Sequence, residues 1–210
     1  MRQLVAMMDI IGMASMLAFI VAFFVARLSL SPESRLTHAD IPNHRSLHVQ
    51  VTPSGGGIGI VLGGFAGGVM FVGFDTLFSS VGWLFTAGVL LALAGYIDDR
   101  RALDAPVRLV IQTTVAVGVI LAGLSLTGMS LGDSIFQFPG LLASIVTGLF
   151  IIWMINLYNF MDGMDGLAAT MAIVGFGALG WLGFVHGDDM FAGTAWILSS
   201  SSLGFLVFNF

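Results

Sequence analysis

The sequence predicts an all-α membrane protein, a polytopic bundle of about seven transmembrane helices in a single membrane domain, residues 1–210. Of the 210 residues, 57% are hydrophobic and 9% are charged, whereas soluble domains carry about 25% charged residues. The hydrophobic residues also fall into long runs, and a bilayer core needs roughly 20 apolar residues per helix. This composition excludes a soluble globular domain and a disordered chain.

The runs define the predicted helices in order. The first, Val5–Leu28, is longer than the apolar region of a cleavable signal peptide, about 7–15 residues, so we expect it to be a retained helix. The second is Gly57–Phe74, and Gly55 to Gly68 contains eight glycines, which let neighbouring helix backbones approach closely. The other five predicted spans are Ser80–Ile97, Val107–Leu124, Leu141–Leu157, Leu167–Phe184 and Phe191–Phe208.

The arginines predict the orientation of these helices. The chain has no Lys, and six of its seven arginines lie on the side of the loops that follow the first, third and fifth spans. Because basic residues favour the cytoplasmic side, we expect those loops in the cytoplasm and the N-terminus outside. The net charge of −5 argues against a nucleic-acid partner. Since the chain has no Cys, disulfides and cysteine-based metal sites are excluded.

Polar residues gather in three clusters on that same predicted side. The first precedes the second span, where Asn43, Arg45, Ser46 and His48 offer donors suited to phosphate and sugar oxygens. The glycines that follow would leave backbone N–H groups at a helix start open to an anion. A cytoplasmic loop with a flexible helix entry is an equally good interpretation of this segment alone.

The second cluster ends the third span at Asp98, Asp99, Arg100 and Arg101. Adjacent carboxylates repel each other and persist where a cation, a proton or a basic partner compensates. Mg²⁺ favours one or two carboxylates together with substrate phosphate. Taken alone, a solvated anchor in which the carboxylates pair with the two arginines is at least as good an interpretation.

The third cluster follows the fifth span, with Asn156, Asn159, Asp162 and Asp165 at three-residue spacing. On a helix this spacing follows one slowly drifting face, but interspersed glycines favour a break. Broken helices at membrane depth line cavities or sites, and a polar turn is the weaker alternative. Together the three clusters combine carboxylates, amides and cations as a metal-assisted reaction on phosphates requires.

The motif strings resemble those of bacterial polyprenyl-phosphate N-acetylhexosamine-1-phosphate transferases, which include the undecaprenyl-phosphate GlcNAc-1-phosphate transferases and the phospho-MurNAc-pentapeptide transferases. Three motifs in family order carry the resemblance, over residues 41–168. They are Pro42-Asn-x-Arg-Ser-Leu-His48 with Thr52-Pro-x-Gly-Gly-Gly57, Gly95-x-x-Asp98-Asp99-Arg100 with Arg108-Leu109-x-x-Gln112, and Asn156-x-x-Asn159-Phe-Met-Asp162-Gly-x-Asp165-Gly-Leu-Ala168. The first motif favours the UDP-N-acetylhexosamine branch, because the muramoyl-pentapeptide branch typically carries a Lys there.

The resemblance implies a reaction and its setting. Undecaprenyl phosphate would attack the β-phosphate of a UDP-N-acetylhexosamine, giving polyprenyl-diphospho-sugar and UMP with Mg²⁺ as cofactor, or Mn²⁺ in its place. This step would begin the synthesis of O-antigen, teichoic acid or a related surface or cell-wall glycan. The resemblance further implies a bacterial inner-membrane enzyme with cytoplasmic active-site loops, and relatives are often homodimers.

Residue roles follow from the same resemblance. Asp98 and Asp99 are expected to be catalytic, Asp98 at the lipid phosphate and Asp99 at the metal–phosphate site. Asp99 and Asn159 are the expected metal ligands. The expected substrate-binding residues are Asn43, Arg45, Ser46, His48, Asn156, Asp162 and Asp165.

The sequence also departs from the family pattern. Relatives have about ten or eleven spans, a later Asp motif and a His-rich loop, so this chain resembles a C-terminally truncated, N-terminal part of the family's transferase domain. A non-catalytic relative that binds lipid phosphate or UDP-sugar is therefore one alternative. A small membrane transporter is another, and it would predict acidic residues at the bilayer midplane, whereas here they lie mostly at span ends.

Overall fold

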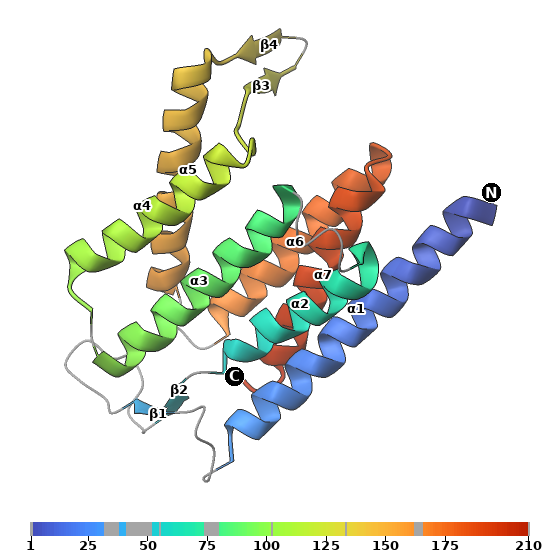
Figure 1. Ribbon diagram of the computed structural model, residues 1–210. Helices are drawn as coiled ribbons and strands as arrows, with labels where there is room; N and C mark the ends of the chain where they lie inside the picture. The colour runs from blue at the N-terminus through green and yellow to red at the C-terminus, as the bar shows by residue number, and fades with distance from the viewer. Residues whose placement is uncertain are drawn as a thin grey trace. The chain divides into compact units, whose positions relative to one another are not determined.

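The computed structural model describes residues 2–31, 38–40, 52–54, 56–73, 80–101, 103–132, 134–161 and 166–209. These residues form seven α-helices and two antiparallel strand pairs (Figure 1). The helices are α1 (Arg2–Ser29), α2 (Ile58–Val72), α3 (Ser80–Arg101), α4 (Ala105–Leu121), α5 (Gly140–Met161), α6 (Leu167–Val185) and α7 (Asp189–Leu206). The strands are β1 (His38–Asp40), β2 (Thr52–Ser54), β3 (Gly128–Leu131) and β4 (Ser134–Gln137).

Internal contacts divide the chain into two compact units. One comprises Met1–Asp75 with Met161–Phe210, and the other comprises Thr76–Phe160. The single membrane domain over residues 1–210 stays a prediction.

In the first unit, α1 and α2 lie side by side (Figure 1). They pack through small residues. Residues four apart lie on one face of a helix, and both helices carry small residues at this interval. They are Ala14, Ala18, Ala22 and Ala26 on α1, and Gly59, Gly63 and Gly67 on α2. The four alanines are at most 2% exposed, and a Cβ placed on Gly63 would lie 2.5 Å from the carbonyl oxygen of Ala18. The glycines therefore let the two backbones touch.

The helix α7 packs against α1, α2 and α6. Its Ile197 is buried against Ala14 and Ala18 of α1. A Cβ placed on Gly204 would lie 2.5 Å from the carbonyl oxygen of Phe19, so α7 also approaches the α1 backbone closely. The hydroxyl of Ser199 donates to the carbonyl oxygen of Ile173 on α6 at 2.9 Å, which links the last two helices by a hydrogen bond suited to a lipid environment.

The strands β1 and β2 bracket the first polar cluster. They pair antiparallel, with His38 opposite Ser54 and Asp40 opposite Thr52. The chain therefore leaves β1 and returns to β2 at neighbouring positions. The predicted site residues of this cluster, Asn43, Arg45, Ser46 and His48, lie outside the described residues.

The second unit contains α3, α4, the β3–β4 hairpin and α5, and α3 packs against α4. The helix α4 begins after Asp104 and carries Pro106 in its first turn, where a missing N–H costs no hydrogen bond. Beyond its end, the backbone N–H of Leu126 donates to the hydroxyl of Thr147 on α5 at 2.8 Å. The connection between α4 and α5 is thus tied to the α5 helix.

The β3–β4 hairpin lies in a segment for which the sequence analysis predicted no element. Met129 pairs with Phe136 and Leu131 pairs with Ser134, and the turn places Gly132 at a φ of +59°. A Gly-Asp pair between two short runs is a hairpin signal, so this element could have been predicted from the sequence.

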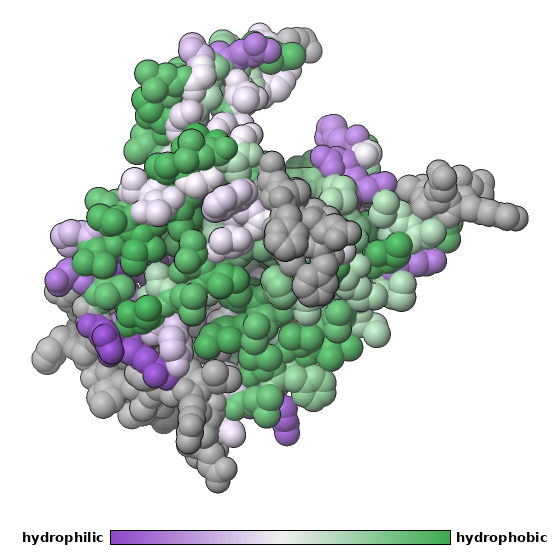
Figure 2. Space-filling view, viewed as in Figure 1, coloured by the Kyte–Doolittle hydropathy of each residue, from purple (hydrophilic) through white to green (hydrophobic). Residues whose placement is uncertain are grey.

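The outer surface of the helices is strongly apolar. Large hydrophobic side chains such as Leu121, Leu141 and Phe160 are exposed, and hydrophobic residues dominate the face seen in Figure 2. Soluble proteins rarely expose such extended apolar surface, whereas lipid tails cover it favourably. The described helices long and apolar enough to cross a bilayer are Val5–Ser29, Gly140–Met161 and Leu167–Val185, and Ile58–Val72 and Ala105–Leu121 are shorter apolar helices.

The predicted architecture is confirmed: each of the seven predicted spans coincides with a helix of an all-α membrane protein. The predicted break in the third cluster is confirmed as well. The helix α5 ends at Met161, and α6 starts after Gly166, whose φ of +68° favours glycine. Asp162 and Asp165 lie between these points, outside the described residues.

Candidate functional site

A pocket of about 150 Å³ opens within the second unit. Its wall combines residues of the second and third polar clusters with apolar residues of α3, α4 and α5. The polar lining residues are Asp98, Arg108, Gln112, Asn156 and Asn159, and the apolar ones are Leu91, Ala94, Gly95, Leu103, Ile111 and Ile155. An apolar pocket with a few converging polar groups is the usual form of a small-molecule site.

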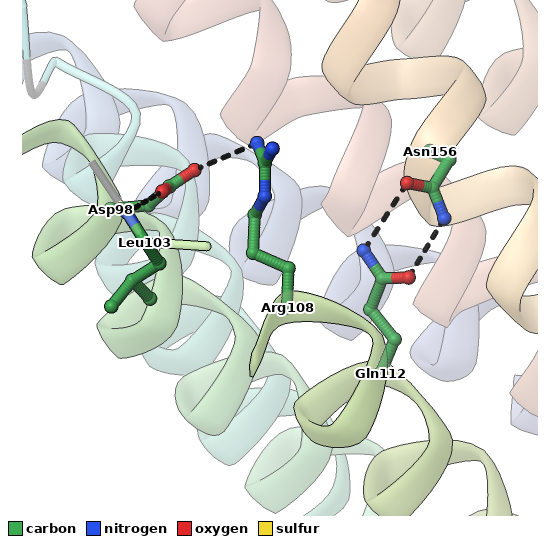
Figure 3. A network of polar contacts seen from close by, with 5 residues as sticks. All are labelled: Asp98, Leu103, Arg108, Gln112 and Asn156. Atoms are coloured by element: carbon green, nitrogen blue, oxygen red, sulfur yellow. Dashed lines mark hydrogen bonds and ion pairs between the residues drawn. The ribbon is translucent and has the colours of Figure 1, made fainter. Parts of the chain in front are cut away.

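Asp98 supplies the carboxylate of this pocket from the last turn of α3. One of its oxygens, Oδ1, accepts a hydrogen bond from the backbone N–H of Leu103 at 2.7 Å. The other, Oδ2, accepts from Nη1 of Arg108 at 3.3 Å, as Figure 3 shows. The Asp98 side chain is 22% exposed and that of Arg108 is 42% exposed. The carboxylate is therefore oriented from two sides while it remains accessible from the pocket.

A pair of side-chain amides joins α4 to α5 beside this carboxylate (Figure 3). The Nδ2 group of Asn156 donates to Oε1 of Gln112 at 2.7 Å, and Nε2 of Gln112 donates back to Oδ1 of Asn156 at 3.4 Å. Gln112 is 8% exposed, whereas Asn156 is exposed beside the pocket. Gln112 lies one helical turn beyond Arg108, so both side chains project from one face of α4.

Other predicted site residues lie near this arrangement or beyond its description. Asn159 lines the pocket from the next turn of α5. Asp99 is exposed and is absent from the pocket wall, because successive helix residues point about 100° apart. Six of the predicted substrate-binding residues lie outside the described residues: Asn43, Arg45, Ser46, His48, Asp162 and Asp165.

The donor set of the pocket is compatible with Mg²⁺. This ion binds through one or two carboxylates and substrate phosphate, keeping several waters. The pocket offers the carboxylate of Asp98 and the side-chain oxygen of Asn159. Within the described part of the chain, no three His, Asp or Glu side chains form a group that could hold a metal by themselves. Substrate phosphate oxygens are the further ligands that Mg²⁺ favours at such a site.

The structure adds two functional candidates that the sequence analysis did not assign a role. Arg108 pairs with Asp98, and Gln112 pairs with Asn156. The four-residue interval between Arg108 and Gln112 was a signal for a shared helix face, and both belong to the second motif. The partners themselves depend on which faces of α4 meet α3 and α5. The four-residue interval does not contain that information.

Comparison with known proteins points to one family. The profile of glycosyl transferase family 4 matches residues 81–210. The probable undecaprenyl-phosphate N-acetylglucosaminyl 1-phosphate transferase of Bacillus subtilis (strain 168) is 29% identical over 204 residues, which cover 93% of this chain and 56% of the relative. The undecaprenyl-phosphate alpha-N-acetylglucosaminyl 1-phosphate transferase of Escherichia coli (strain K12) is 30% identical over 177 residues, covering 81% of this chain and 46% of the relative.

A third relative is named for a different polyprenyl carrier. The decaprenyl-phosphate N-acetylglucosaminephosphotransferase of Mycobacterium leprae (strain TN) is 29% identical over 219 residues, covering 95% of this chain and 54% of the relative. The chain spans about half the length of the curated relatives it matches. No solved structure matches the chain.

Proposed function

Because this chain belongs to glycosyl transferase family 4, we propose that the natural protein transfers an N-acetylhexosamine-1-phosphate from a UDP-sugar to undecaprenyl phosphate. An oxygen of the lipid phosphate attacks the β-phosphorus of the UDP-sugar. The bond from that phosphorus to the bridging oxygen breaks, and UMP leaves. The product, polyprenyl-diphospho-sugar, stays in the membrane as the starting unit of a surface glycan.

The observation that carries this proposal is the pocket in which Asp98, Arg108 and Asn159 meet. It joins the second and third motifs of the family in one place, although they lie far apart in the sequence. The names of the relatives support the substrate class, since each is described as a polyprenyl-phosphate N-acetylglucosamine phosphotransferase.

The chemistry of the pocket suits a lipid acceptor. Its apolar lining residues, which include Leu91, Ile111 and Ile155, can cover the first part of a polyprenyl chain. The guanidinium of Arg108 has five N–H donors, and Asp98 accepts from its Nη1. Its remaining donors can hold phosphate oxygens. Asp98 would then lie beside the acceptor phosphate, whose attacking oxygen is already largely ionised near neutral pH.

Mg²⁺ is part of the proposal, with Asp99 and Asn159 as its expected ligands. When bound, the ion neutralises the developing charge on the transferred phosphoryl group. Asn159 lies in the pocket wall, whereas Asp99 lies one residue beyond Asp98 and outside that wall, so Asp98 is the carboxylate that the pocket itself offers. Active-site loops facing the cytoplasm, where UDP-sugars are made, complete the proposed arrangement.

The first test is a transfer assay on the complete natural protein in detergent. UDP-GlcNAc, undecaprenyl phosphate and Mg²⁺ are supplied, and UMP and lipid-linked sugar are both measured, with EDTA as a control. We expect the two products in equal amounts and their loss with EDTA. Asp99→Asn should lower the rate by about 100-fold or more, since it removes a charge at the phosphoryl site.

Asp104→Asn is the matched control for that variant. Asp104 is an exposed carboxylate that precedes α4, and its side chain makes no capping hydrogen bond. The transfer activity of the Asp104→Asn variant should therefore stay within about twofold of wild type. UMP without lipid-linked sugar would indicate hydrolysis. Binding of UDP-sugar without any product, across a panel of UDP-N-acetyl sugars, would instead favour a non-catalytic relative.

A further inference from the structure

The amide pair between Gln112 and Asn156 links α4 to α5 at the pocket. The two residues lie 44 positions apart and exchange hydrogen bonds in both directions. Gln112 is buried and Asn156 is exposed beside the pocket. A buried glutamine thus supports an asparagine that faces the site.

A backbone carbonyl determines how both amides are oriented. Nδ2 of Asn156 also donates to the carbonyl oxygen of Ile152 at 2.8 Å. A carbonyl oxygen can only accept, so the NH₂ end of Asn156 must face it, and the assignment of nitrogen and oxygen in this amide follows. Because Oδ1 of Asn156 then points to Gln112, the glutamine must present its own NH₂ there and its Oε1 to Nδ2.

The same bonds use both hydrogens of the Asn156 amide. One goes to Gln112 and the other goes to Ile152. Asn156, predicted from the sequence to bind substrate, therefore has no N–H left to donate to a ligand in this conformation. The first donor ties α5 to α4, and the second, made within α5, orients the amide oxygen.

We propose that Gln112 is a positioning residue for transfer: it fixes Asn156 and thereby places Arg108 of α4 and Asn159 of α5 in the wall of the same pocket. This inference rests on the proposed function. Arg108 lies one turn before Gln112 on α4, and Asn159 lies one turn after Asn156 on α5. Tying the two amides therefore sets the separation between the guanidinium that holds Asp98 and the expected ligand of Mg²⁺.

The side chain at position 112 must both donate and accept, as an amide does at every pH. It must accept from Nδ2 of Asn156 and donate to Oδ1 of the same residue. A leucine does neither, and a carboxylate accepts but cannot donate until it is protonated. The requirement gives each substitution a distinct expected behaviour.

The test measures kcat and KM for UDP-GlcNAc in the complete natural protein. Gln112→Leu should lower kcat by about tenfold, because the amide of Asn156 loses both hydrogen bonds to position 112. The change in KM should be smaller. Asn156→Leu should do the same, and the double variant should lose no more than either single variant, because both remove one interaction. The thermal unfolding midpoints are recorded for the same four proteins and for Gln112→Glu.

Gln112→Glu separates positioning from a merely structural role. Its activity relative to wild type should rise as the pH is lowered, since protonation of the new carboxyl restores the donor to Asn156. Thr113→Val is the matched control. Thr113 is a neighbouring polar residue whose hydroxyl donates to Leu109 within its own helix, so this variant should follow the wild-type pH profile.

The outcomes are distinct. An inactive wild-type protein would overturn the proposed function, and with it the positioning role. An active wild type with Gln112→Leu within about twofold of it, or with single-variant losses that multiply in the double variant, would overturn the role of Gln112 alone. A Gln112→Glu profile parallel to wild type, with a lowered unfolding midpoint, would reduce Gln112 to a structural contact.

Discussion

At the scale of one residue, Asp98 places a carboxylate from the end of α3 into the wall of the candidate site. Its carboxylate is held by the backbone N–H of Leu103 and by Arg108. Both side chains keep contact with water, and ion pairs of this kind stabilise a protein by about 0–1 kcal/mol. The pair therefore contributes little to the free energy of unfolding. Its main effect is to orient the carboxylate of Asp98.

This leads to a prediction for Arg108→Gln. The substitution should lower the unfolding free energy by less than about 1 kcal/mol. Transfer should fall by about tenfold or more, because Asp98 loses one of its two orienting partners and the site loses a cation for phosphate. Thermal unfolding and the transfer assay, on the same preparation, measure the two effects.

Arg101→Gln is the control for Arg108→Gln, because Arg101 is an exposed arginine at the end of α3 and is absent from the pocket wall. It should leave both quantities close to wild type. Equal losses of activity in the two variants would mean that general positive charge matters and that the Asp98–Arg108 contact does not.

At the scale of helices, the close approach of α1 and α2 rests on glycine. A Cβ placed on Gly63 would lie 2.5 Å from the carbonyl oxygen of Ala18 and 2.9 Å from the Cβ of Ala22. Neither atom belongs to a flexible side chain, so the helices would have to move apart. In lipid, where no hydrophobic force drives helices together, such loss of packing is not offset elsewhere.

We therefore predict that Gly63→Ala lowers the unfolding free energy by about 1–3 kcal/mol, the usual effect of overpacking a close contact. Thermal unfolding in detergent measures it. Gly12→Ala is the matched control on α1, where a Cβ would have no atom within 4 Å. Alanine favours a helix over glycine by up to about 1 kcal/mol, so this control should be neutral or stabilising. The same loss in both variants would contradict the packing argument.

The elements also show where local signals were enough. Glycines at 55–68 predicted a close helix contact, and glycines beside Asp162 and Asp165 predicted a helix break, because both effects depend on backbone freedom at single positions. The β3–β4 hairpin was missed although Gly132 precedes Asp133 in its turn. Its strands are too short for a clear alternation of apolar and polar residues.

At the scale of the whole molecule, the orientation in the membrane stays a prediction from the arginines. A chain without Cys makes this prediction easy to test, since a single introduced thiol has no competitor. Ser134→Cys places a thiol at an exposed position of β4, and Asp104→Cys places one at the start of α4.

In intact cells, a membrane-impermeant maleimide should label Ser134→Cys, because the hairpin follows the fourth span and lies on the predicted outer side. Asp104→Cys should be labelled only after the membrane is permeabilised. The reverse pattern would invert the predicted topology and would place the pocket on the side opposite to UDP-sugar. Labelling of both in intact cells would contradict a membrane crossing by α4, the helix between the two positions.

The sequence by itself determined the all-α membrane class, the seven helices and three of the residues that line the pocket, Asp98, Asn156 and Asn159. Run length, glycine content and motif spacing are properties of residues that are close in the sequence, so they can be recognised without the folded structure. Tertiary structure alone decided that Gln112 meets Asn156 and that Arg108 meets Asp98. Those contacts depend on which helix faces pack, and packing is a property of the folded arrangement that no local spacing encodes.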